Sequence, residues 1–227
     1  MSLYDHYASY KNYTTPRVGA KHIRKFDTDV WEPLACRSDM SFLEIGCGTG
    51  LFLLYLHHKS VASFSGLDQD AKLESVLPDE VKGRFQCADI WDYLNGADGS
   101  AKFDRIVLFD VMEHFTAEEG IKLLQLLTER LTPSGKLLFK TPNAASPWGL
   151  QFQNGDLTHK TAYTPDSMRQ LAAAAGYTCE KMYPHYLGSP SRQRKDRLFH
   201  WLVSKCVATP PEIWTANFYS VLSPILR

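Results

Sequence analysis

The chain has 227 residues, of which 44% are hydrophobic and 22% are charged, and its formal net charge is zero. This composition is typical of a soluble globular protein with one domain and appended segments. A balanced charge creates no field that would attract nucleic acid, and no basic–aromatic pattern of a nucleic-acid-binding module is present. The five cysteines lack metal-site spacing. We therefore expect reduced thiols, no metal, no nucleic-acid partner and a cytoplasmic protein.

The first part of the chain has helical periodicity. Tyr4, Tyr7, Tyr10 and Tyr13 repeat every three residues, so they share one face if this segment is a helix. Apolar residues continue at helical spacing up to the point where the pattern changes. We predict a helical cap segment over residues 1–36, and a tyrosine that lines a binding site is one alternative to simple packing.

From residue 40 onward, short apolar runs alternate with amphipathic stretches. This alternation predicts parallel strands joined by helical crossovers, and hence a three-layer α/β sandwich. We place this domain at residues 37–187. The expected strands cover residues 40–46, 61–68, 84–89, 103–110, 136–142 and 177–184, and the expected helices cover 50–59, 70–77, 117–131 and 165–176.

A glycine-rich segment, FLEIGCGTGLF, follows the first expected strand. Gly46, Gly48 and Gly50 would let a ligand approach the backbone closely, because glycine has no Cβ and tolerates positive φ. The spacing departs from the dinucleotide fingerprint, which disfavours a nicotinamide-dependent enzyme. No Gly-Lys-Ser/Thr follows, so a phosphate-binding loop is excluded. The remaining alternatives are a ligand-binding loop and a tight strand-to-helix turn without a ligand.

This segment resembles motif I of the class I S-adenosylmethionine-dependent methyltransferases. Four further segments follow in family order: FSGLDQD, QCADIWDY, FDRIVLFDVMEHF and LTPSGKLLFKTPN. The resemblance covers residues 40 to about 183. It implies a seven-stranded, mostly parallel Rossmann-like sheet with helices on both faces. It also implies S-adenosylmethionine as cofactor, S-adenosylhomocysteine as product, and an N-terminal segment that closes over the cofactor.

The resemblance also implies individual roles at the strand ends. Asp68 would accept hydrogen bonds from both ribose hydroxyls, for which a carboxylate is a suitable acceptor. Asp89 would bind the adenine amino group with Ile90 against the ring, and Glu44 would hold the glycine loop near the methionine end. The expected cofactor contacts are Glu44, Gly46, Cys47, Gly48, Gly50, Leu51, Asp68, Gln69, Asp89, Ile90 and Asp110.

Two histidines are candidates for a general base. His114 follows the fourth expected strand, and His159 lies in a long loop over residues 142–162, a kind of loop that is often functional. A hydroxyl acceptor benefits from a base, whereas a phosphate or carboxylate does not. His159 could instead order its loop through a bond to Asp156, or be oriented by that carboxylate, and His114 could pack against the cofactor.

The stretch after the fifth strand resembles a bacterial branch related to the ubiquinone-biosynthesis O-methyltransferases. That branch often acts on polysaccharide or lipopolysaccharide precursors. We therefore expect O-methylation of a small polar or glycan-type acceptor with a histidine base. The alternatives are an N-methyltransferase, a carboxyl or phosphate methyltransferase without a base, and a non-catalytic cofactor-binding assembly protein.

Residues 188–227 break the α/β alternation, and we expect a helical appendage there. The segment SRQRKDRLFHWLVSKCV places four basic residues before a run rich in apolar residues. Such a pattern fits an interfacial helix on an anionic membrane or a docking helix for a partner. It also fits packing on the domain itself or on a second subunit. A peripheral membrane or partner contact through residues 192–206 and a homodimer therefore remain open.

Overall fold

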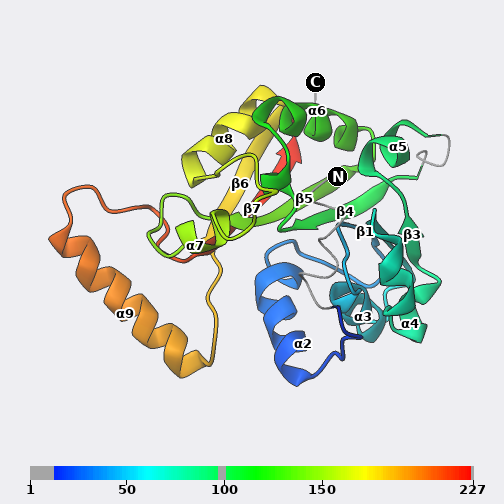
Figure 1. Ribbon diagram of the computed structural model, residues 1–227, viewed down its shortest axis with the longest axis horizontal. Coiled ribbons are helices and arrows are strands. Elements are labelled where there is room, and N and C mark those ends of the chain that lie inside the picture. The colour runs from blue at the N-terminus through cyan, green and yellow to red at the C-terminus, as the bar shows by residue number, and fades with distance from the viewer. Residues whose placement is uncertain (1–12, 97–100, 226–227) are drawn as a thin grey trace.

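A seven-stranded sheet forms the centre of the protein, with the spatial order β3-β2-β1-β4-β5-β7-β6 (Figure 1). The computed structural model describes residues 13–96 and 101–225. The strands from β3 to β5 are parallel, whereas β7 runs antiparallel to both β5 and β6. The strands are β1 (Ser41–Ile45), β2 (Ser63–Asp68), β3 (Phe85–Cys87), β4 (Phe103–Phe109), β5 (Leu131–Pro142), β6 (Tyr177–Pro184) and β7 (Asn217–Pro224).

Helices cover both faces of this sheet. One apolar core includes side chains of α3 (Leu51–His58) and of the π-helix η2 (Asp27–Trp31), which continues α2 (Ala20–Phe26). The other core includes α5 (Ile90–Asn95), α6 (Ala117–Thr128) and α8 (Pro165–Ala174). Figure 1 shows the two groups on opposite sides of the strands. The remaining helices are η3 (Ala71–Ser75), α4 (Asp79–Lys82), η5 (Met112–His114), α7 (Leu150–Gln153) and α9 (Pro190–Cys206).

Local sequence accounts for where the helices near the site begin. The Thr116 hydroxyl accepts a hydrogen bond from the Glu119 amide at 3.2 Å, and the Glu119 carboxylate accepts one from the Thr116 amide at 2.8 Å. This reciprocal capping satisfies two amides that the helix itself leaves unpaired. Thr164 and Ser167 form the same arrangement at the start of α8. Capping therefore fixes the residues at which α6 and α8 begin.

The expected α/β class, with seven strands and helices on both faces, is confirmed, but the sheet is mixed rather than mostly parallel. The expectation of a helical appendage over residues 188–227 is corrected as well. Among residues 188–225, which the structure describes, only Pro190–Cys206 is helical, and β7 inserts between β5 and β6. Phe218 and Leu222 of β7 are fully buried. A strand buried on both faces lacks the polar alternation that identifies a strand in sequence, which explains the error.

Other expected elements differ in extent. The expected helix at 70–77 is a shorter 3-10 helix, η3, and the helix expected to reach residue 131 ends at Thr128. In the N-terminal segment the structure shows helix over residues 20–31, whereas Tyr4, Tyr7 and Tyr10 lie outside the described residues. Within residues 13–96 and 101–225, no helix is long and apolar enough to cross a membrane.

We expect Phe218→Ala to lower the free energy of unfolding by about 3–5 kcal/mol, because it leaves a cavity in a fully buried strand. Phe199→Ala is the matched control. Phe199 lies in α9 and is 49% exposed, so its loss should change stability by about 0.5 kcal/mol or less. Urea denaturation of both variants measures the difference. Equal losses would contradict the placement of β7 inside the sheet.

Candidate functional site

A cavity of about 630 Å³ opens at the carboxyl ends of the central strands. The strand order reverses between β1 and β4, and this is the point where open α/β sheets bind ligands. Tyr13 reaches the cavity from the N-terminal segment, and burial together with Asp70 and Asp68 raises its pKa to about 12. Of the expected cofactor contacts, Gly46, Gly48, Asp68, Gln69, Asp89, Ile90 and Asp110 line this large cavity, whereas Glu44, Cys47, Gly50 and Leu51 do not.

The glycine loop between β1 and α3 leaves the backbone bare on the cavity side. Gly46 has a φ of +72°, and a Cβ there would lie 2.4 Å from Cγ2 of Val111, which is too close for any side chain. Gly48 has a φ of +51°, and a Cβ there would meet nothing within 4 Å. Packing and backbone conformation therefore require glycine at position 46. At position 48 the backbone conformation favours glycine, and the missing side chain keeps space open.

Asp68 connects the end of β2 to this loop. Its Oδ2 accepts a hydrogen bond from the Gly48 amide at 3.0 Å, and its Oδ1 accepts one from the Asp70 amide at 3.1 Å. Burial raises the pKa of Asp68, and the amide bonds counteract this by favouring the ionised form. Each carboxylate oxygen has two lone pairs, so Asp68 retains the capacity to accept hydroxyl donors from a ligand in the cavity.

Two further acidic residues stand at strand ends on the cavity rim. Asp89 begins α5, where its Oδ1 accepts hydrogen bonds from the amides of Trp91 at 2.7 Å and Asp92 at 3.4 Å. Asp110 follows β4 with a φ of +56° and forms an ion pair with Lys140 at 2.5 Å. A non-glycine residue held at positive φ is uncommon and is often found at functional sites.

Glu44 lies behind the glycine loop, in the middle of the sheet. It is 4% exposed, and its Oε2 has no hydrogen-bond partner among the described residues. Burial, and then the charge of Asp68, raise the pKa of Glu44 well above its usual range. An unpartnered carboxyl oxygen is costly in an apolar interior, and the raised pKa lowers this cost by favouring the neutral form. The bare loop and the aspartates that line the large cavity fit a polar cofactor.

A smaller cavity of about 310 Å³ adjoins the large one, and Asp110 and His114 line both. His159 lines the small cavity from the loop between α7 and α8. The rings of His114 and His159 meet edge to face, with centroids 4.7 Å apart. The structure therefore brings together the two histidines expected to act as a base, although 45 positions separate them in the sequence.

Hydrogen bonds orient both rings. Nδ1 of His159 lies 2.9 Å from the Gln153 carbonyl oxygen, which can only accept, so Nδ1 carries the proton and Nε2 carries the lone pair of the neutral ring. Nδ1 of His159 is thus held by a backbone carbonyl and not by Asp156, which was one of the alternatives. Asp156 instead accepts from the Thr158 hydroxyl at 2.6 Å, and that hydroxyl oxygen lies 2.9 Å from Nδ1 of His114.

Glu113 also lines the small cavity and was not among the expected site residues. It is fully buried, and neither carboxyl oxygen has a hydrogen-bond partner within the described ranges. Burial, and then the charges of Asp110 and Asp156, raise its pKa well above the usual range. A neutral carboxyl group provides an O–H donor to whatever occupies the cavity. The only sequence signal for it is its place beside His114, directly after a buried strand.

The same side chains bear on metal binding. Ligand atoms of His114, Asp156 and His159 all lie within 4.8 Å of one another, close enough for one cation to be held between them. The sequence suggested no metal-ligand cluster, because these residues come from two distant segments. Imidazole and carboxylate are ordinary ligands for divalent transition metals.

The topology, with a bare loop and a cavity at its switch point, is that of a Rossmann-like fold with a ligand site. A family model described as a methyltransferase domain matches residues 20–182. The chain belongs to this methyltransferase family and is an enzyme. Family and fold together are those of the class I methyltransferases, whose cofactor is S-adenosylmethionine. No curated protein matches the sequence significantly.

Solved structures agree with this fold. A SAM-dependent methyltransferase from Archaeoglobus fulgidus superposes with a TM-score of 0.64 at 18% identity, over 97% of this chain and 99% of the other. A S-adenosylmethionine-dependent methyltransferase from Clostridium acetobutylicum ATCC 824 gives a TM-score of 0.62 at 13% identity, over 98% and 99%. At these identities the likeness shows a shared fold and nothing about the acceptor.

We expect Glu113→Gln to raise the free energy of unfolding at neutral pH. The pKa of Glu113 is raised in the folded protein, so the unfolded chain ionises first and the wild type loses stability as pH rises. The advantage of the variant should therefore grow from about pH 4.3, the ordinary pKa of glutamate, up to the raised pKa of the folded state. Urea denaturation across this window measures it.

Glu118→Gln is the control for this experiment, because Glu118 is an exposed carboxylate on α6. Its stability difference from the wild type should stay small at every pH. A constant difference between Glu113→Gln and the wild type over the whole window would show that Glu113 is ionised in the folded protein.

Proposed function

We propose that this enzyme transfers a methyl group to a hydroxyl oxygen of a small polar or glycan-type acceptor, with His159 as the general base. The observation that supports this best is the junction of the two cavities at Asp110 and His114, with the oriented ring of His159 on the wall of the smaller one. Bound S-adenosylmethionine supplies an activated methyl group on a sulfonium. The residues of the chain position the cofactor and the acceptor, and they take up the proton that the acceptor hydroxyl loses.

The large cavity would hold the cofactor, which leaves as S-adenosylhomocysteine. Gly46 and Gly48 give it a bare backbone surface, and Asp68 offers acceptor lone pairs to the ribose hydroxyls. Asp89 and Ile90 also line this cavity, and they would contact the adenine ring. Glu44 acts from behind the loop, since it does not line the cavity.

The small cavity would hold the acceptor. Nε2 of neutral His159 can take the hydroxyl proton, because Nδ1 is already committed to the Gln153 carbonyl. His114 stands at the junction and is connected to Asp156 through Thr158. The neutral carboxyl of Glu113 can donate a hydrogen bond that orients the acceptor.

The charge of the small cavity bears on the alternatives. The aspartates Asp110 and Asp156 line it beside the uncharged Glu113, and no lysine or arginine does so among the described residues. A carboxylate or phosphate acceptor would meet electrostatic repulsion there. A neutral hydroxyl fits, and an amine fits as the second choice. The resemblance of the loop after β5 to the bacterial branch that modifies glycans supports a hydroxyl-rich acceptor.

Asp68→Asn should weaken S-adenosylmethionine binding by about 1.5–3 kcal/mol, as expected for the loss of charge-assisted hydrogen bonds to the ribose. Asparagine keeps one oxygen acceptor for the Gly48 amide. Asp79→Asn, an exposed change on α4, is the matched control and should leave the affinity unchanged. Isothermal titration calorimetry measures both. An affinity equal to wild type in Asp68→Asn would remove the ribose assignment.

His159→Gln should lower turnover by about 100- to 10,000-fold, the usual contribution of a positioned general base. Cofactor affinity should stay close to wild type, because His159 lines the small cavity and not the large one. An acceptor is first found by screening sugars, phenols and amines for S-adenosylhomocysteine formation. His57→Gln, on the exposed side of α3, is the control. Unchanged turnover in His159→Gln would move the base to His114 or point to a reaction without one.

A further inference from the structure

The helix α9 stands apart from the rest of the fold. It spans 17 residues between β6 and β7, and Figure 1 shows it at the edge of the molecule, away from the sheet. The structure describes α9 in full, and none of its residues is buried. Its contacts with the rest of the fold include Trp214, whose Nε1 donates to the Ser204 hydroxyl at 2.7 Å and whose ring stacks on His200 with centroids 6.0 Å apart.

The amphipathic pattern of this helix is reversed. The side that is half-buried carries Gln193, Asp196, His200, Val203 and Ser204, four of which are polar. The opposite side, at helical spacing, carries the most exposed apolar side chains. Surface helices normally turn their apolar stripe toward the core, so this arrangement needs an external surface to cover it. These exposed side chains are Leu198 at 59%, Trp201 at 57% and Leu202 at 51%.

Positive charge accompanies the exposed apolar side chains. Arg194, Lys195 and Lys205 are all exposed around them. The one acidic residue in the helix sequence, Asp196, lies on the half-buried side and pairs with Arg192 at 2.9 Å. The exposed side of α9 therefore combines three cations with three apolar side chains and no anion.

We propose that this side of α9, formed by Arg194, Lys195, Leu198, Trp201, Leu202 and Lys205, docks on the surface of an anionic lipid bilayer. The apolar side chains would enter the boundary between headgroups and acyl chains, and the cations would meet lipid phosphates. Tryptophan and lysine are favoured at this depth, because an apolar body and a polar end suit the interface. The protein lies on the bilayer and does not cross it.

A second copy of the chain fits this surface less well. A twofold interface brings the same patch of two subunits together, so these arginine and lysine side chains would lie against an equally basic patch. The described part of the helix offers no acidic side chain on that side to neutralise them. Like charges held together at an interface are unfavourable, whereas anionic headgroups neutralise all three cations.

Two further aromatic side chains are exposed, one beside α9 and one at the small cavity. The Trp148 ring, which is 43% exposed, lies beside Phe199 of α9 with centroids 6.4 Å apart. Phe152 of α7 is 43% exposed and lines the small cavity. Docking through α9 would thus bring the small cavity close to the lipid surface.

Vesicle co-sedimentation of the full-length protein tests the proposal. The wild type should bind vesicles of equimolar phosphatidylcholine and phosphatidylglycerol, bind pure phosphatidylcholine much more weakly, and release from the former as salt is raised. Arg194→Gln with Lys195→Gln should weaken binding by about fivefold for each charge removed. Trp201→Ser with Leu202→Ser should weaken binding to the same vesicles, because it removes apolar surface that would enter the bilayer.

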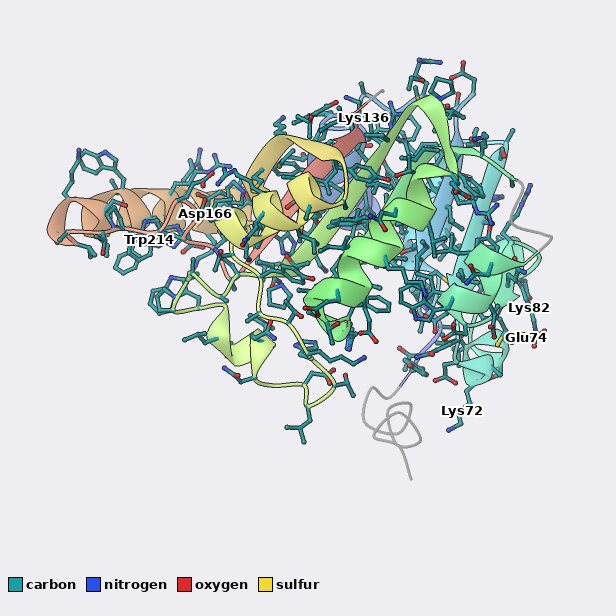
Figure 2. All side chains as sticks on the ribbon, turned by 90° about the horizontal axis from the view of Figure 1, so that it is seen from above. Lys72, Glu74, Lys82, Lys136, Asp166 and Trp214 are labelled. Carbon is teal, nitrogen blue, oxygen red and sulfur yellow. The ribbon has the colours of Figure 1, made fainter. Side chains whose placement is uncertain are left out.

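The matched charge control is Lys72→Gln with Lys82→Gln. Figure 2 shows both lysines at the end of the molecule opposite α9, and both are exposed. This pair should bind vesicles like the wild type. All variants should keep the wild-type melting temperature, since none of the changed side chains is buried.

Three results would overturn the proposal. The first is equal binding of the wild type to the two kinds of vesicle, or binding to neither. The second is an equal loss in the Lys72/Lys82 control and in the Arg194/Lys195 variant. The third is a dimer in sedimentation velocity that Trp201→Ser with Leu202→Ser dissociates, without vesicle binding, which would assign this surface to a second copy. None of these results depends on methyl transfer, so the proposed function is judged separately.

Discussion

The hydrogen bond from the Gly48 amide to the Asp68 carboxylate is the interaction on which the site depends. It joins the turn after β1, which borders the switch point of the sheet, to the end of the neighbouring strand β2. The turn can adopt this path because residues 46 and 48 have positive φ, and Val111 leaves no space for a side chain at 46. The same carboxylate that would bind the ribose therefore also shapes the backbone surface beneath the cofactor.

A second set of hydrogen bonds attaches the loop that carries His159 to the sheet. The amides of Lys160 and Thr161 donate to the Glu113 carbonyl at 2.8 and 3.1 Å, and the Thr161 hydroxyl donates to the Phe115 carbonyl at 2.7 Å. These bonds tie the loop before α8 to the turn after β4. His159 precedes the attached residues directly, so its distance from His114 follows from backbone pairing and is not left to a flexible loop.

The sequence predicted the parts of the site that are local, and it missed the parts that depend on long-range packing. The glycine loop, Asp68 and Asp89 each stand next to a recognisable strand end, so motif order was enough to place them. The meeting of His114 and His159 depends on the fold of the intervening loop. Glu113 was missed because its burial comes from that loop, and β7 was missed because both of its faces are covered.

The zero net charge of the chain conceals an uneven distribution of charge. Carboxylates gather where the strands end, because Asp68, Asp89 and Asp110 line the large cavity. This end of the sheet would be repelled by an anionic surface over distances of about one Debye length. The basic, apolar side of α9 can offset this repulsion, because it lies outside the sheet and is exposed along its length. An acidic site that favours neutral or cationic acceptors can therefore work beside an anionic bilayer when a separate helix supplies the attraction.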